Sequence, residues 1–174
     1  GALLRNHELI RRIAEELRPI VEGKLTLKTR IGFESPAEFD ALLALFASLP
    51  IDGLAIHGRT VRERYQSDVH TAEIARAVIE LPFPVVANGS IVSVSSANAM
   101  WRKTGAAGLM IGRGAIRNPW LFAQIRDCFA NRESFRPRLR DVLEYLLELT
   151  EEIVAEGNFE KETQVVNRMK KFTN

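Results

Sequence analysis

Four short apolar runs of the chain end in glycine, amide or cationic residues that can bind an anion. These ends cover residues 25–30, 56–60, 86–90 and 110–114. A helical pattern follows each run, and strands that alternate with helices are parallel, with their carboxyl ends at one edge. In a barrel of such strands the carboxyl rim carries the active site. The pattern therefore predicts an enzyme.

The last two strand ends predict a phosphate site. They read Asn88-Gly89-Ser90 and Gly112-Arg113-Gly114, and one helix and one strand separate them. In barrels, the loops after the seventh and eighth strands bind phosphate beside a short helix. Glycine lets backbone N–H groups approach the oxygens closely, and arginine adds a charged, two-pronged contact.

The first two strand ends carry basic side chains, and each has two interpretations. Lys28 and Arg30 share one face of their strand because side chains alternate. Lys28 either holds the anionic edge of a cofactor, such as N1 and O2 of a reduced flavin, or reaches solvent. His57 either donates to a carbonyl or phosphate oxygen, or is a satisfied core histidine. Arg59 and Thr60 directly after it favour the functional interpretation.

Composition is ordinary for a soluble globular protein, and it leaves the partner open. The 174 residues are 46% hydrophobic and 26% charged, with a net charge of +2 and a pI of about 8.9. The single cysteine, Cys128, cannot form an internal disulfide, so a reducing compartment is expected. Its helical surroundings predict a buried thiol rather than a nucleophile. The sequence shows no metal-ligand spacing, no signal peptide and no apolar run of membrane length.

The order of elements predicts an α/β fold: the C-terminal half of a TIM (β/α)8 barrel, followed by part of an α-helical domain. An opening helix precedes four strand–helix units, and four parallel strands make half of an eight-stranded barrel. After about residue 131 the composition changes. An arginine cluster is followed by a long stretch in which apolar residues recur with the period of a helix. We therefore expect domains at 1–131 and 132–174, cut from a longer protein.

Together these residues resemble the tRNA-dihydrouridine synthases, over nearly the whole chain. The matching stretches are Gly1-Ala2-Leu3-Leu4-Arg5-Asn6, Leu27-Lys28-Thr29-Arg30-Ile31-Gly32, His57-Gly58-Arg59-Thr60, Ala87-Asn88-Gly89-Ser90-Ile91, Ile111-Gly112-Arg113-Gly114-Ala115, Asn118-Pro119-Trp120 and Asn167-Arg168-Met169-Lys170-Lys171.

The resemblance implies a cytoplasmic enzyme that reduces the 5,6 double bond of uridine in tRNA, using FMN that NADPH re-reduces. Lys28 and His57 match the family's flavin contacts. The residues that match its phosphate loops are Asn88, Gly89, Ser90, Gly112 and Arg113. The positions expected near the tRNA substrate are Arg30, Arg59 and Thr60.

Two departures from the family pattern carry expectations of their own. Many members have an acidic residue where Ser90 stands. The family's general acid is a cysteine in the loop before the segment that begins at Gly1, and it protonates C5 as hydride goes to C6. Cys128 does not match it, so we expect no catalytic residue in this chain and no activity of the chain alone. A half barrel also has two open edges, which predicts self-association or marginal stability of the isolated chain.

Two other functions share part of the pattern. One is another phosphate-binding barrel: a flavin oxidoreductase for a small molecule, or an enzyme of histidine or tryptophan biosynthesis. It does not predict His57-Gly58-Arg59-Thr60 followed by a basic helical domain. The other is a non-catalytic RNA-binding or scaffold fragment, in which the arginines of residues 132–140 and Lys170-Lys171 contact phosphates. Those residues are equally compatible with a solvated linker face.

Overall fold

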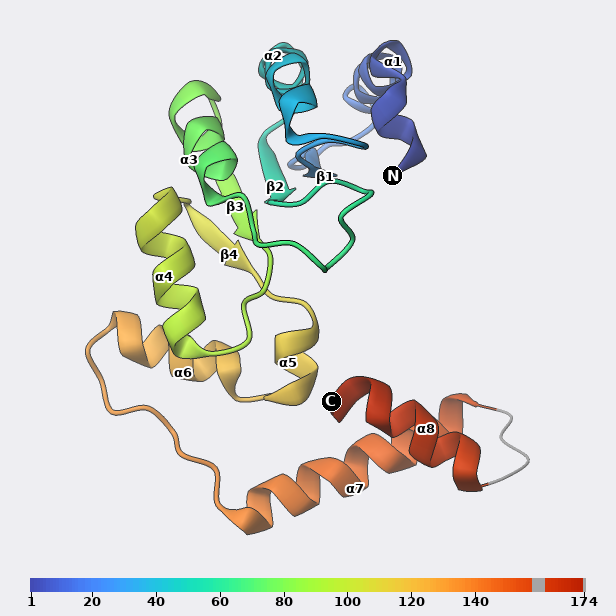
Figure 1. Ribbon diagram of the computed structural model, residues 1–174, viewed down its shortest axis with the longest axis vertical. Coiled ribbons are helices and arrows are strands. Elements are labelled where there is room, and N and C mark those ends of the chain that lie inside the picture. The colour runs from blue at the N-terminus through green and yellow to red at the C-terminus, as the bar shows by residue number, and fades with distance from the viewer. Residues whose placement is uncertain (158–161, 174) are drawn as a thin grey trace. The chain divides into compact units, whose positions relative to one another are not determined.

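All four expected strands form, and they pair in parallel (Figure 1). The computed structural model describes residues 1–157 and 162–173. The strands are β1 (Thr26–Arg30), β2 (Gly53–His57), β3 (Val85–Asn88) and β4 (Gly108–Met110), and they lie in the order β1-β2-β3-β4. Because each strand follows its neighbour through a helix, this confirms the predicted part of a barrel.

Helices α1 to α4 lie along one face of the sheet (Figure 1). Their bounds are α1 (His7–Leu17), α2 (Phe39–Ala47), α3 (Thr71–Glu80) and α4 (Val94–Thr104), with the 3₁₀ turns η1 (Ala2–Arg5) and η2 (Pro36–Glu38). The expected caps form at two helix starts. Asn6 accepts a hydrogen bond from the Leu9 N–H. Ser35 and Glu38 make a reciprocal capping box, which satisfies N–H groups that the first turn leaves unpaired.

The core lies between this face of the sheet and the helices. Ile56 of β2 and Ala87 of β3 are fully buried there. Phe39 and Phe46 of α2 and Ile74 of α3 are also buried, with at most 1% of each exposed. This layer fixes which strand residues face away from the helices, because side chains alternate along a strand.

The structure divides into two compact units, each described here by itself. The first comprises residues 1–91 and 95–111, and the second residues 92–94 and 112–174. The second unit contains α5 (Arg113–Arg117), α6 (Leu121–Phe129), α7 (Leu139–Glu156) and α8 (Glu162–Thr173). The pattern of the sequence did not predict α5. The expected boundary at 131/132 stays a prediction, and residues 158–161 and 174 of the expected second domain lie outside the described residues.

In the second unit, α7 packs through a small aromatic group. The Tyr145 hydroxyl donates a hydrogen bond to the Ile116 carbonyl at 2.5 Å, and burial raises the Tyr145 pKa. The Trp120 ring lies 6.1 Å from the Tyr145 ring and 5.8 Å from the Phe135 ring. Along α7, only Ile153 is buried.

Candidate functional site

The strand register places three of the predicted site residues in one row at the carboxyl ends of the strands. Arg30 of β1 pairs with His57 of β2, and His57 pairs with Asn88 of β3. Paired residues of parallel strands point to the same face, so these side chains share the face opposite the helices. Lys28 lies two residues before Arg30 and therefore belongs to the same face.

Lys28 is exposed on this face, and it borders a cavity of about 420 Å³ at the edge of β1. Arg30 also lines the cavity. The remaining lining is mostly apolar, from Gly1, Leu3, Leu4, Ile10, Ile13, Leu27, Thr29, Phe46 and Val61. Most of these apolar residues come from η1, α1 and α2, so the cavity runs along the open edge of β1 beside the helices.

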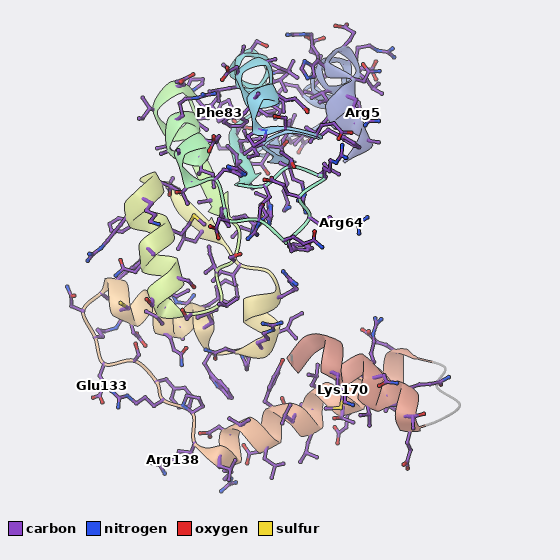
Figure 2. The ribbon with its side chains drawn as sticks, in the orientation of Figure 1. Arg5, Arg64, Phe83, Glu133, Arg138 and Lys170 are labelled. Carbon is purple, nitrogen blue, oxygen red and sulfur yellow. The ribbon has the colours of Figure 1, made fainter. Side chains whose placement is uncertain are left out.

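The connection from β2 to α3, which carries Arg64 (Figure 2), reaches back to this row. The Arg30 guanidinium donates to the Thr60 carbonyl at 2.6 Å and to the Arg64 carbonyl at 3.1 Å. It lies 5.6 Å from the centre of the exposed Tyr65 ring. The same ring meets His57 edge-on, with 5.9 Å between the centroids. The connection therefore contributes to the environment of both Arg30 and His57.

Glu63 holds the connection together, and sequence reasoning missed it. Its carboxylate accepts a hydrogen bond from the Thr60 N–H at 2.6 Å and lies 2.7 Å from His70 Nε2. The Glu63 N–H donates back to Thr60 Oγ1 at 3.2 Å. The spacing Thr-x-x-Glu is the signal that could have found this reciprocal pair, which is a capping box on a turn.

Opposing effects act on the Glu63 pKa, and the hydrogen bonds outweigh burial. Burial raises it, while the bonds from His70 and Thr60 lower it, and together they bring it to about 2. The carboxylate is thus ionised over the whole physiological range. His70 is half-buried in this pair.

Arg59 links the connection to the turn after β3. Its side chain is only 5% exposed. Nε donates to the Ser67 carbonyl at 2.7 Å, and Nη2 donates to Ser90 Oγ at 2.9 Å. The Asn88 amide, two residues before Ser90, donates to the Met110 carbonyl of β4 at 2.6 Å. Ser90 is exposed, so its hydroxyl is available to a ligand.

The other predicted site residues fall in two different settings. Thr60 is fully buried and serves the turn around Glu63, so its expected contact with substrate stays a prediction. Gly112 and Arg113 follow β4 in the sequence and belong to the second unit, where both are exposed. Their part in phosphate binding stays a prediction as well.

Among residues 1–157 and 162–173, no group of histidine, cysteine, aspartate or glutamate side chains is placed to hold a metal ion. Cys128 is a free thiol on α6, half-buried. No helix in this part of the chain is long and apolar enough to cross a membrane.

Comparison with known proteins gives one consistent result. The family model described as dihydrouridine synthase matches residues 1–173. The tRNA-dihydrouridine synthase B of Xanthomonas axonopodis pv. citri is 37% identical over 138 residues, which are 79% of this chain and 42% of that protein.

Two further relatives agree with this match. The probable tRNA-dihydrouridine synthase of Helicobacter pylori strain 26695 is 39% identical over 129 residues, which are 73% of this chain and 39% of that protein. The tRNA-dihydrouridine synthase B of Pseudomonas putida is 34% identical over 150 residues, which are 85% of this chain and 44% of that protein. The chain thus spans less than half the length of these relatives.

Proposed function

We propose, from the premise that the chain belongs to the dihydrouridine synthase family, that it forms part of an FMN-dependent tRNA-dihydrouridine synthase. The observation that carries the proposal is the row of Arg30, His57 and Asn88 across the carboxyl ends of three parallel strands. Such a row, on the face turned away from the helices, is where barrel enzymes bind their ligands. An enzyme that modifies tRNA would work in the cytoplasm.

The residues present fit FMN by their chemistry. The Lys28 ammonium and the His57 imidazole can donate to an anionic ring edge. The exposed Ser90 hydroxyl, next to the buried Arg59 charge, suits a phosphate. Gly89, whose φ is 137°, lets the turn that carries Ser90 form. When bound, FMN supplies hydride for the uridine 5,6 double bond, and NADPH is the proposed source of electrons.

The residues of this chain would bind and orient rather than form bonds. Lys28 would hold the negative edge of the ring in place. His57, with Tyr65 against its edge, would fix the ring from the neighbouring strand. We place Arg30 nearest to the tRNA, because its guanidinium joins β1 to the connection that carries exposed Tyr65.

The test is the dihydrouridine content of tRNA in bacteria that lack their own dihydrouridine synthases and express the complete gene that encodes this chain, because we expect no activity of the chain alone. Mass spectrometry of the tRNA nucleosides should show dihydrouridine. Lys28→Met should lower it about tenfold or more, as expected for loss of a charged contact. The matched control is Lys24→Met, because Lys24 is exposed and lies just before the same strand. Normal protein levels with no dihydrouridine would overturn the proposal, and so would equal yields from both variants.

A further inference from the structure

Arg59 is a buried cation whose guanidinium is held at two points. The Ser67 carbonyl fixes Nε, and the Ser90 hydroxyl accepts from Nη2. We infer that Arg59 is a positioning residue, which orients the Ser90 hydroxyl to donate its hydrogen to the phosphate of the bound flavin nucleotide. This inference rests on the proposed function, and it assigns a role that neither the resemblance nor the comparisons give to Arg59.

The direction of the hydrogen bond sets what Ser90 can do. A guanidinium has only donors, so the Ser90 oxygen must accept from Arg59. The hydroxyl hydrogen then remains available to another acceptor, and Ser90 is exposed. A hydroxyl that accepts from a cation is also a better donor, because hydrogen bonds in a chain polarise one another. An oxygen of an anion is the partner this hydrogen favours.

The backbone around Ser90 holds the hydroxyl in place. Ser90 has a φ of 50° and Gly89 a φ of 137°, which residues other than glycine seldom adopt. Such a turn persists only where its surroundings determine it. The hydrogen bond from Arg59 is one such constraint, and it acts on the side chain that the ligand would meet.

The segment that carries Arg59 packs tightly against the same turn. Val69 lies against both glycines: a Cβ atom would lie 2.6 Å from its Cγ1 if added at Gly58, and 3.0 Å if added at Gly89. The Gly58 N–H donates to the Asn88 carbonyl at 3.1 Å, and the His70 N–H donates to the Gly58 carbonyl at 2.7 Å. These contacts therefore fix the backbone that carries Arg59 against the turn that carries Ser90.

The burial of Arg59 favours this positioning role over the contact with tRNA that the sequence suggested. With 5% of its surface exposed, Arg59 offers little to a tRNA molecule. Its charge remains, because arginine stays protonated in proteins. A buried cation directly behind an exposed hydroxyl supports an anion bound at that hydroxyl, both through the hydrogen bond and through its field.

The experiment compares two ligands that differ only in the phosphate. The dissociation constants of FMN and of riboflavin are measured by flavin fluorescence for the complete wild-type protein that contains this chain and for four variants of it. These are Arg59→Met, Arg59→Lys, Ser90→Ala and the double variant Arg59→Met with Ser90→Ala. Arg62→Met is the matched control, because Arg62 is exposed on the same connection and pairs with Glu34.

Arg59→Met and Ser90→Ala should each weaken FMN binding by about tenfold, the size expected for a charge-assisted contact. Riboflavin binding should change by less than about twofold. The double variant should be no weaker than Arg59→Met by more than about twofold, since both changes remove one linked contact. Arg59→Lys should recover part of the loss, because lysine keeps the charge and lacks the planar fork. Arg62→Met should match the wild type.

The outcomes separate the inference from the proposed function. Equal losses for FMN and riboflavin would overturn the inference, and so would independent losses that multiply to about a hundredfold in the double variant. If circular dichroism shows that Arg59→Met does not fold, the FMN and riboflavin affinities of Ser90→Ala and Arg59→Lys test the inference by the same criteria. A complete wild-type protein that binds neither flavin would overturn the proposed cofactor and the inference with it.

Discussion

Helix α2 of the first unit and helix α7 of the second keep their large apolar side chains in different environments. In the first unit, residues of the sheet and of α2 and α3 are fully buried, among them Leu42, Ile56 and Ile74. In the second, α7 leaves Leu143 and Leu147 more than half exposed. Helices of both units have amphipathic spacing. The helical period of the apolar residues therefore identifies an apolar face, but it does not establish that other residues bury this face.

The sharpest way to test this difference is to remove the same side chain from each unit. Leu42→Ala empties a fully buried position, and such changes cost about 3 kcal/mol or more. Leu143→Ala, at a position that is 56% exposed, should cost less than about 1 kcal/mol because little contact is lost. Urea unfolding followed by circular dichroism measures both. Equal losses would show that the two units do not differ in the way described.

The contrast between the units also explains what could be predicted from the sequence. The four strands and the capping box at Ser35 follow from local patterns, and all are found. Parallel strands bring their carboxyl ends to one edge, and the observed register puts Arg30 beside His57 there. Local patterns suffice wherever neighbouring residues determine the backbone.

The tertiary links of the site lay beyond local patterns. The segment around Glu63 and His70 is polar and has no period, so its hydrogen bonds could not be inferred from hydropathy. The burial of Arg59 depends on Ser67 and on Ser90, 31 residues away. Such hydrogen bonds depend on how two connections meet in space. Among them, only the reciprocal bonds of Thr60 and Glu63 could be predicted, from the Thr-x-x-Glu spacing.

Acid should weaken the first unit through Glu63. The Glu63 pKa is lowered to about 2, below the value of about 4.3 for a free glutamate. Stability from this group is therefore fully present above pH 4.3 and is lost as pH falls toward 2. After allowance for screening, we expect a loss of about 2 kcal/mol over that range.

Glu63→Gln should remove this part of the pH dependence and lower stability at pH 7 by a similar amount. Urea unfolding at a series of pH values measures both effects. Glu16→Gln serves as the control, because Glu16 is an exposed carboxylate on α1. Parallel pH profiles for the wild type and Glu63→Gln would contradict the assigned role.

Glycine substitutions compare packing at the first unit's site with packing at the start of α5. A Cβ atom at Gly58 would lie 2.6 Å from Val69 Cγ1, whereas no atom lies within 4 Å of one at Gly112. Gly58→Ala should therefore cost about 1.5 kcal/mol through overpacking. Gly112→Ala should change stability by less than about 0.5 kcal/mol. Thermal unfolding of both variants checks this, and a stable Gly58→Ala variant would mean that Val69 can move aside.

The smallest effect is expected from an ion pair of the second unit. Arg140 Nε lies 2.7 Å from Glu144 Oε1, but the two side chains are 86% and 54% exposed. Exposed pairs contribute at most about 0.5 kcal/mol, and the order arginine then glutamate is the weaker one on a helix. Arg140 also lies in the first turn of α7, where a positive charge is unfavourable. These terms nearly cancel, so Arg140→Ala should change stability by less than about 0.3 kcal/mol.

Urea unfolding at low and high salt measures this, because salt screens such a pair. A salt-dependent loss of stability above about 1 kcal/mol would mean that this exposed ion pair stabilises the fold to an extent comparable with the Glu63 contacts. That result would contradict the electrostatic difference between the two units.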